Sequence, residues 1–200
     1  DFPLRDADEE TIDCWPMPSP DDFDYDLLLK SCGRFHEYGV FYGNPGLGDI
    51  INSAGMIRTM EQVLVDLVTN DPAGLRLIDR RLSVQLEVMS RSLEKAKGII
   101  DFVWLGEDLG TQRGPTIGLD LYRKHIRPRH QQFVDVAKSY GLPVIIHSCG
   151  SSSWAFEDFI EMGIDAVDTL QPEAKDMSPD FLKKRFGGRL AFHGCICTAG

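Results

Sequence analysis

Positive charge is scarce in this sequence. Lys and Arg number 21 against 31 Asp and Glu, which gives a formal net charge of −10. Proteins that hold a nucleic-acid backbone carry clusters of basic residues, and no such cluster with interleaved aromatic residues is present. We therefore expect no nucleic-acid partner.

Long apolar runs are also missing. No stretch approaches the roughly 20 apolar residues that span a bilayer. The first ten residues, DFPLRDADEE, have neither the basic start nor the apolar core of a secretory signal. Hydrophobic residues make up 42% and charged residues 26%, which is the composition of a globular protein. We expect a cytoplasmic protein with no membrane partner.

Cysteine is sparse and odd in number. A secreted disulfide framework needs a denser and even set. Three of the five cysteines lie at or near the ends of predicted strands. We therefore expect reduced thiols, some of them bound to a metal. The cysteines are Cys14, Cys32, Cys149, Cys195 and Cys197.

The apolar stretch LPVIIHSCG, residues 142–150, is the clearest predicted strand, and it ends in His147 and Cys149. Further strands are predicted at residues 99–105, 166–170 and 189–193, separated by helices. This order predicts parallel strands whose carboxyl ends share one face. No strand is followed by the glycine-rich turn of dinucleotide-binding proteins, so we favour a barrel over a doubly wound sheet.

Helical spacing of apolar residues predicts the segments that cover the sheet. The acidic, proline-punctuated residues 1–26 lack this spacing and are predicted to be irregular, whereas residues 27–200 are predicted to form the barrel domain. With a short fifth strand near residues 39–42, the barrel would lack N-terminal strands and the last strand. Because the chain does not begin with Met, we expect a piece of a longer protein. The predicted helices span residues 56–68, 71–98, 119–126, 128–141, 151–163 and 178–187.

Polar side chains follow each predicted strand. Because the carboxyl ends of parallel strands meet at one face, these side chains are expected to line one cavity. The candidates are Glu107 and Asp108 for catalysis, Gln112, Gln171 and His193 for substrate binding, and His147, Cys149 and Cys195 for a metal.

The residue types at these strand ends predict a metal site. Residues two apart on an extended chain point to the same side, so His147 and Cys149 converge. Three protein ligands with an open fourth position are the pattern of catalytic zinc. Spacing alone does not choose among Cys195, Cys197 and His193 for the third place.

The adjacent acids Glu107 and Asp108 have several roles open to them. Either would serve as an additional ligand, as an acceptor for the His147 imidazole or as a general base. Without a metal, carboxylates at a barrel mouth stabilise a cationic or protonated intermediate, and the cysteines are then passive walls. Solvated loop acids and helix capping are the structural alternatives for both residues.

A series of motifs occurs in a specific order. They are EDLGTQRGP (107–115), YRKHIRP (122–128), HSCG (147–150), GIDAVDTLQ (163–171), EAKDM (173–177) and LKKRFG (182–187). With these motifs the chain resembles the uroporphyrinogen decarboxylase superfamily, which also contains cobalamin-dependent methyltransferases. The resemblance covers roughly residues 56–200. It implies a (β/α)8 TIM barrel with the site at the carboxyl ends of the strands.

The methyltransferase branch of this family implies a zinc ion held by a His-x-Cys-Gly pair and a later cysteine. His147, Cys149 and Gly150 match the pair. Cys195 is the provisional third ligand, although it and Cys197 stand where much of the superfamily has Gly and Asp, and a residue beyond 200 is the alternative. The resemblance implies that zinc activates a thiol, which takes a methyl group from a corrinoid such as methylcobalamin. The partner would be a small molecule or a corrinoid protein, and family members commonly form homodimers.

Two alternative functions stay open from the sequence. The decarboxylase branch implies a lyase of porphyrin biosynthesis that acts on uroporphyrinogen. That branch uses an Arg-Gln-Ala-Gly-Arg-Tyr segment and a catalytic Asp after an early strand, and neither is present. Arg113 is the only arginine close to a strand-end motif. The other alternative is a non-catalytic barrel that binds a corrinoid or a metal.

Overall fold

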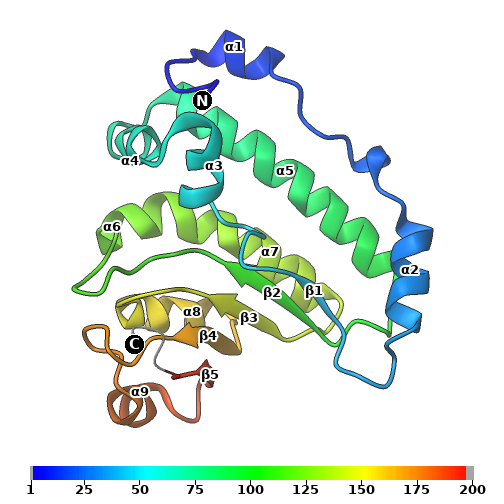
Figure 1. Ribbon diagram of the computed structural model, residues 1–200, viewed down its shortest axis with the longest axis vertical. Coiled ribbons are helices and arrows are strands. Elements are labelled where there is room, and N and C mark those ends of the chain that lie inside the picture. Colours follow the sequence, from blue (N-terminus) through cyan, green and yellow to red (C-terminus); the bar gives the residue numbers. More distant parts are fainter. Residues whose placement is uncertain (1, 197–200) are drawn as a thin grey trace.

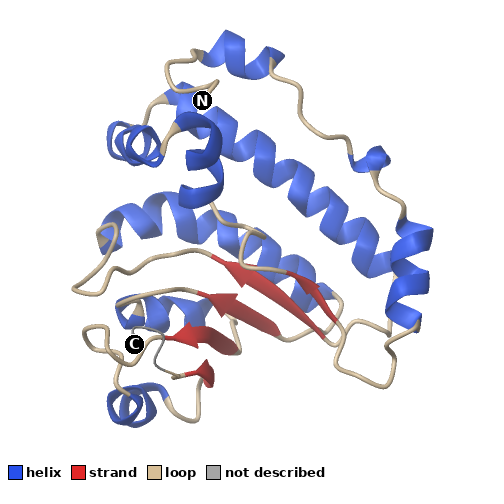
Figure 2. Cartoon of the chain, viewed as in Figure 1, coloured by secondary structure: helices blue, strands red, loops and turns tan. Residues whose placement is uncertain are grey.

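The described residues form a sheet of five parallel strands. This computed structural model describes residues 2–196. Figure 2 shows the strands side by side. They confirm the predicted parallel α/β class, and closure into a (β/α)8 barrel stays a prediction. In sheet order, which is also chain order, the strands are β1 (Phe41–Gly43), β2 (Phe102–Gly106), β3 (Val144–His147), β4 (Ala166–Leu170) and β5 (Ala191–Gly194).

Helices connect the strands and flank the sheet. Figure 1 shows α7 and α8 beside the strands that they join, and the long α5 beyond them. Among the helices of residues 2–196, none combines the length and apolarity needed to cross a membrane. The helices are α1 (Glu9–Cys14), α2 (Tyr25–Gly33), α3 (Ile51–Arg58), α4 (Met60–Thr69), α5 (Pro72–Lys95), α6 (Leu119–Leu121), α7 (Arg127–Ser139), α8 (Phe156–Met162) and α9 (Pro179–Phe186), with 3-10 turns at Pro20–Asp22 and Ser153–Ala155 and a π-helical turn at Tyr122–Ile126.

Alternating burial along the central strands gives the sheet two different faces. Val103 and Leu105 of β2 are fully buried, whereas Trp104 between them is half-buried. The same alternation occurs in β3, where Val144 and Ile146 are fully buried. Side chains on a strand alternate between faces, so one face packs into the helical core and the other carries His147.

The N-terminal segment contains helix α1. The expectation that residues 1–26 are irregular is therefore wrong for residues 9–14. Asp8 caps the helix, since its Oδ1 accepts a hydrogen bond from the Thr11 backbone N–H at 2.9 Å. Glu9 and Glu10 in the first turn interact favourably with the helix dipole. Ile12 is fully buried in a small cluster with Leu4. Capping and tertiary burial therefore stabilise a helix too short to show an apolar period.

The single helix predicted for residues 56–68 is wrong, because the structure divides this region into α3 and α4. Thr59 separates them with a φ of 73°. Its hydroxyl accepts a hydrogen bond from the Gln62 backbone N–H at 3.1 Å and so caps α4. Val63 and Leu67 are buried as predicted, but Val68 is 66% exposed.

Gly106 ends β2 with another backbone segment pressed against it. Its N–H donates to the Leu47 carbonyl at 3.0 Å. A Cβ atom at this position would lie 1.9 Å from the carbonyl oxygen of Pro45. The loop after β1 therefore lies against the end of β2, and only glycine permits this approach.

We predict that Gly106→Ala lowers the free energy of unfolding by about 2 kcal/mol or more, because backbone atoms must shift to admit the methyl group. Gly33→Ala is the control, since a Cβ there meets nothing within 4 Å. It should change stability by less than about 1 kcal/mol. Urea unfolding of both variants measures the difference, and equal stabilities would contradict the close approach.

Candidate metal centre

Parallel register brings three strand ends together. Gly106 of β2 pairs with His147 of β3, and His147 pairs with Asp168 of β4. Paired residues on neighbouring parallel strands lie at the same level of the sheet and point to the same face. His147 therefore has an acid on one side and a glycine on the other. The chain continues from Gly106 directly into Glu107 and Asp108.

Three side chains converge at this level. The Cys149 Sγ lies 3.4 Å from the His147 Nε2, and an Asp108 oxygen lies 3.5 Å from the same nitrogen. One ligand atom from each of Asp108, His147 and Cys149 lies within 4.8 Å of the other two. All three side chains are half-buried. Thiolate, imidazole and carboxylate are all ligands that zinc accepts, so the donor set fits zinc.

Asp108 is held by two hydrogen bonds. The Cys149 backbone N–H donates to one carboxylate oxygen at 3.0 Å. The Asn52 side-chain amide donates to the other oxygen at 3.2 Å. Asn52 belongs to α3, so this helix and the loop after β3 together fix the carboxylate beside His147.

Asp168 connects two histidines. Its carboxylate accepts a hydrogen bond from the His147 Nδ1 at 3.2 Å and another from the His193 Nδ1. A proton on Nδ1 of His147 leaves Nε2, the atom beside Cys149, as a metal ligand. Asp168 was missing from the sequence-based candidates. Its signal is an acid in the middle of the apolar strand AVDTL, where a buried charge requires partners.

The neighbouring charges shift the pKa values of this cluster. Burial alone lowers the pKa of His147, but hydrogen bonds with Asp108, Cys149 and Asp168 outweigh it and raise the pKa to about 10. The hydrogen bond with His147 is the main cause that lowers the pKa of Asp108 to about 2. The metal-free cluster therefore holds a proton on His147, and a metal would displace that proton.

Glu107 is not brought into this cluster. Its carboxylate accepts hydrogen bonds from the Ile50 and Ile51 backbone N–H groups at 2.8 and 3.1 Å. These amides begin α3, and the Glu107 residue is 1% exposed. Burial raises the pKa of Glu107 to about 7. Glu107 thus caps the helix that carries Asn52, while its neighbour Asp108 points to the site.

The two predicted substrate-binding glutamines meet at the edge of the cluster. The Gln171 side-chain oxygen accepts a hydrogen bond from the Gly150 backbone N–H at 2.7 Å. The Gln112 amide approaches the same oxygen at 3.5 Å. Gln171 therefore holds the loop that carries Cys149. His193, the third predicted substrate-binding residue, stands beside Asp168 with its side chain 78% exposed.

Cys195 lies outside the converging group. Its backbone N–H donates to the Leu170 carbonyl at 3.0 Å, and its φ is 62°. In the described part of the chain, Asp108 rather than Cys195 is the third member of the converging group. A ligand role for Cys195 stays a prediction. Its alternative, Cys197, lies outside the described residues.

Comparisons with known proteins support the fold. No protein-family model matches the sequence, and no curated protein matches it. A solved structure, a methyltransferase from Methanosarcina mazei, is similar with a TM-score of 0.56 and 12% sequence identity. The match covers 86% of this chain and 58% of that protein, so this chain spans less than two thirds of its length. The two chains share a fold at a low level of sequence identity.

We predict that metal-free protein loses stability between pH 6.5 and 10 through His147. The folded pKa of about 10 lies above the ordinary value of 6.5, so protonation stabilises the folded state, fully below pH 6.5 and not at all above pH 10. His147→Gln removes this contribution. The stability difference between the wild type and His147→Gln should therefore shrink as the pH rises.

Urea unfolding in the presence of a chelator measures this difference at each pH. His36→Gln, at an exposed histidine away from the cluster, is the control. A difference for His147→Gln that stays constant from pH 6.5 to 10 would show that the neighbouring acids do not hold the proton.

Proposed function

We propose that this protein is a zinc-dependent methyltransferase that moves a methyl group between a corrinoid and a thiol, and that its sheet belongs to a closed (β/α)8 barrel. The observation that carries the proposal is the convergence of Asp108, His147 and Cys149 at the carboxyl ends of parallel strands. Active sites of parallel α/β folds lie at this end. The structural likeness to a methyltransferase supports the same reading.

The ligand arrangement suits a catalytic rather than a structural zinc ion. Asp108, His147 and Cys149 would supply three protein ligands, and a tetrahedral ion then keeps one position for a substrate. When bound, zinc supplies a Lewis acid that deprotonates a coordinated thiol and presents it as a nucleophile. Asp168 and Asn52 orient His147 and Asp108 through the hydrogen bonds described above.

In this proposal His193 accepts the proton of the substrate thiol. Its Nδ1 donates to Asp168, which leaves Nε2 as the accepting atom on an exposed side chain. The same Asp–His arrangement fixes the tautomer of general bases in other enzymes. In this proposal Asp168 serves two imidazoles: one held for the metal and one held for proton transfer.

The charge of the cluster favours methyl transfer over the decarboxylation of an acidic tetrapyrrole. The hydrogen bond with His147 is the main cause that lowers the pKa of Asp108. Burial opposes a low pKa at Asp168, but hydrogen bonds with His193, Thr169 and His147 outweigh it and lower the pKa. A substrate with several carboxylates requires cations around it. Arg113 is exposed, and its backbone N–H donates a hydrogen bond to the Thr111 hydroxyl at 3.3 Å.

Zinc titration of the purified chain tests the metal site. We expect one zinc ion per chain, with Cys149→Ser weakening the affinity by more than about 100-fold. Asp168→Asn should weaken it by about 10- to 100-fold, as for other partners of a metal-bound histidine. Cys32→Ser, at a half-buried cysteine of α2, is the control and should leave the affinity unchanged. Unchanged affinity in Cys149→Ser would overturn the proposed site.

Product analysis with methylcobalamin and a thiol tests the reaction. The zinc-loaded chain should form the methyl thioether, and Cys149→Ser should not. Coproporphyrinogen formation from uroporphyrinogen would instead favour the decarboxylase function. Zinc binding without either product would favour a non-catalytic metal-binding barrel.

A further inference from the structure

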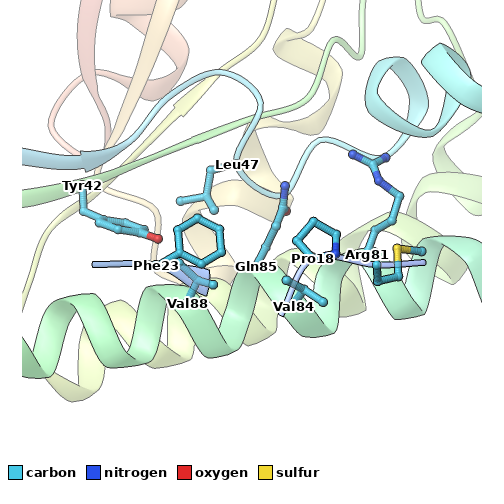
Figure 3. A pocket seen from close by; sticks show the side chains of 9 residues that line it. Pro18, Phe23, Tyr42, Leu47, Arg81, Val84, Gln85 and Val88 are labelled. Atoms are coloured by element: carbon cyan, nitrogen blue, oxygen red, sulfur yellow. The ribbon is translucent and has the colours of Figure 1, made fainter. Parts of the chain in front are cut away.

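A cavity lies between α5, β1 and the N-terminal segment (Figure 3). Its volume is about 300 Å³. Figure 3 shows Tyr42 and Phe23 at one end, Arg81 at the other, and Val84 and Val88 of α5 along the floor. The remaining lining residues are Met17, Pro18, Leu47 and Gln85.

Arg81 differs from the other three arginines of α5. It is half-buried, and burial lowers the pKa of its guanidinium. Within residues 2–196 it makes no ion pair and no hydrogen bond. Each of the others is engaged: Arg76 with Asp13 at 2.7 Å, Arg80 with the Ile12 and Trp15 carbonyls, and Arg91 with Glu87 at 2.7 Å.

Gln85, a polar side chain that lines the cavity, already has hydrogen-bond partners. The Gln85 amide accepts a hydrogen bond from the Gly48 N–H at 3.0 Å and donates to the Gly46 carbonyl at 3.3 Å. Gln85 therefore holds the loop after β1. Among the described lining residues, the charged group left for a ligand is the Arg81 guanidinium.

The charge of Asp49 acts on Arg81. Among the described residues, no hydrogen bond or ion pair joins the two side chains. One Asp49 oxygen accepts a hydrogen bond from the Ser53 N–H at 2.6 Å. Burial and the nearby Glu107 raise the pKa of Asp49 to about 7. A raised pKa means that the protein disfavours the charged form of Asp49.

We propose that this cavity binds a small amphipathic carboxylate, whose anionic end pairs with Arg81 and whose apolar chain packs on Val84, Val88 and Leu47. A guanidinium pairs with a carboxylate through two parallel hydrogen bonds, and partial burial strengthens them. The apolar lining excludes strongly hydrophilic anions. The volume is at the lower end of the roughly 300–1,000 Å³ of small-molecule sites, so one short chain fits.

Octanoate is the probe for this site. Isothermal titration of the purified chain should show saturable binding at one site per chain. Arg81→Gln should weaken binding by about tenfold or more, and so should Val88→Phe, which fills the cavity while Arg81 stays in place. Arg34→Gln is the matched control, because Arg34 lies over the Phe35 ring outside the cavity. It should bind octanoate like the wild type.

Three chemical controls separate the parts of the ligand. Octylamine and octanol should bind at least about tenfold more weakly because they lack the anion, and acetate should bind weakly because it lacks the chain. Octanoate binding that is equal in the wild type, Arg81→Gln and Val88→Phe would overturn the proposal. Equal binding of octylamine and octanoate, or no saturable binding of octanoate, would also overturn it. Thermal unfolding without ligand verifies that each variant is folded.

Discussion

The register between β2, β3 and β4 is the constraint on which the candidate site depends. It sets Gly106, His147 and Asp168 at one level of the sheet. A shift by one residue would turn His147 into the helical core and expose Ile146 in its place. The fully buried Val103, Leu105, Val144 and Ile146 oppose such a shift, so packing of the core fixes the position of the imidazole.

Hydrogen bonds between the loops after the strands fix the remaining residues of the cluster. Asp108 leaves β2 and is tied to the Cys149 amide, while Gln171 leaves β4 and is tied to the Gly150 amide. The loop that carries Cys149 is therefore held from both neighbouring strands. Such hydrogen bonds between loops hold the side chains of Asp108 and Cys149 in position, which would reduce the ordering that binding of a metal requires.

The local sequence pattern predicted the strands and two of the three converging side chains. The strand at residues 166–170 is confirmed, and the His-x-Cys spacing places His147 beside Cys149. Pattern did not assign the third side chain to Asp108, because the direction of a loop residue depends on tertiary contacts such as the one with Asn52. The sequence pattern also could not distinguish the roles of Glu107 and Asp108. The Glu107 carboxylate caps a helix, whereas the Asp108 carboxylate belongs to the cluster. The break at Thr59 depends on a positive φ that no periodicity signals.

The proposed function requires that Asp108, His147 and Cys149 together hold a metal ion. A crystal structure of the zinc-loaded chain, with anomalous difference density measured on both sides of the zinc absorption edge, would locate that ion. We expect one peak, bonded to the Cys149 Sγ, the His147 Nε2 and an Asp108 oxygen. A peak bonded to Cys195 with Asp108 turned away, or no peak among these three side chains, would contradict it.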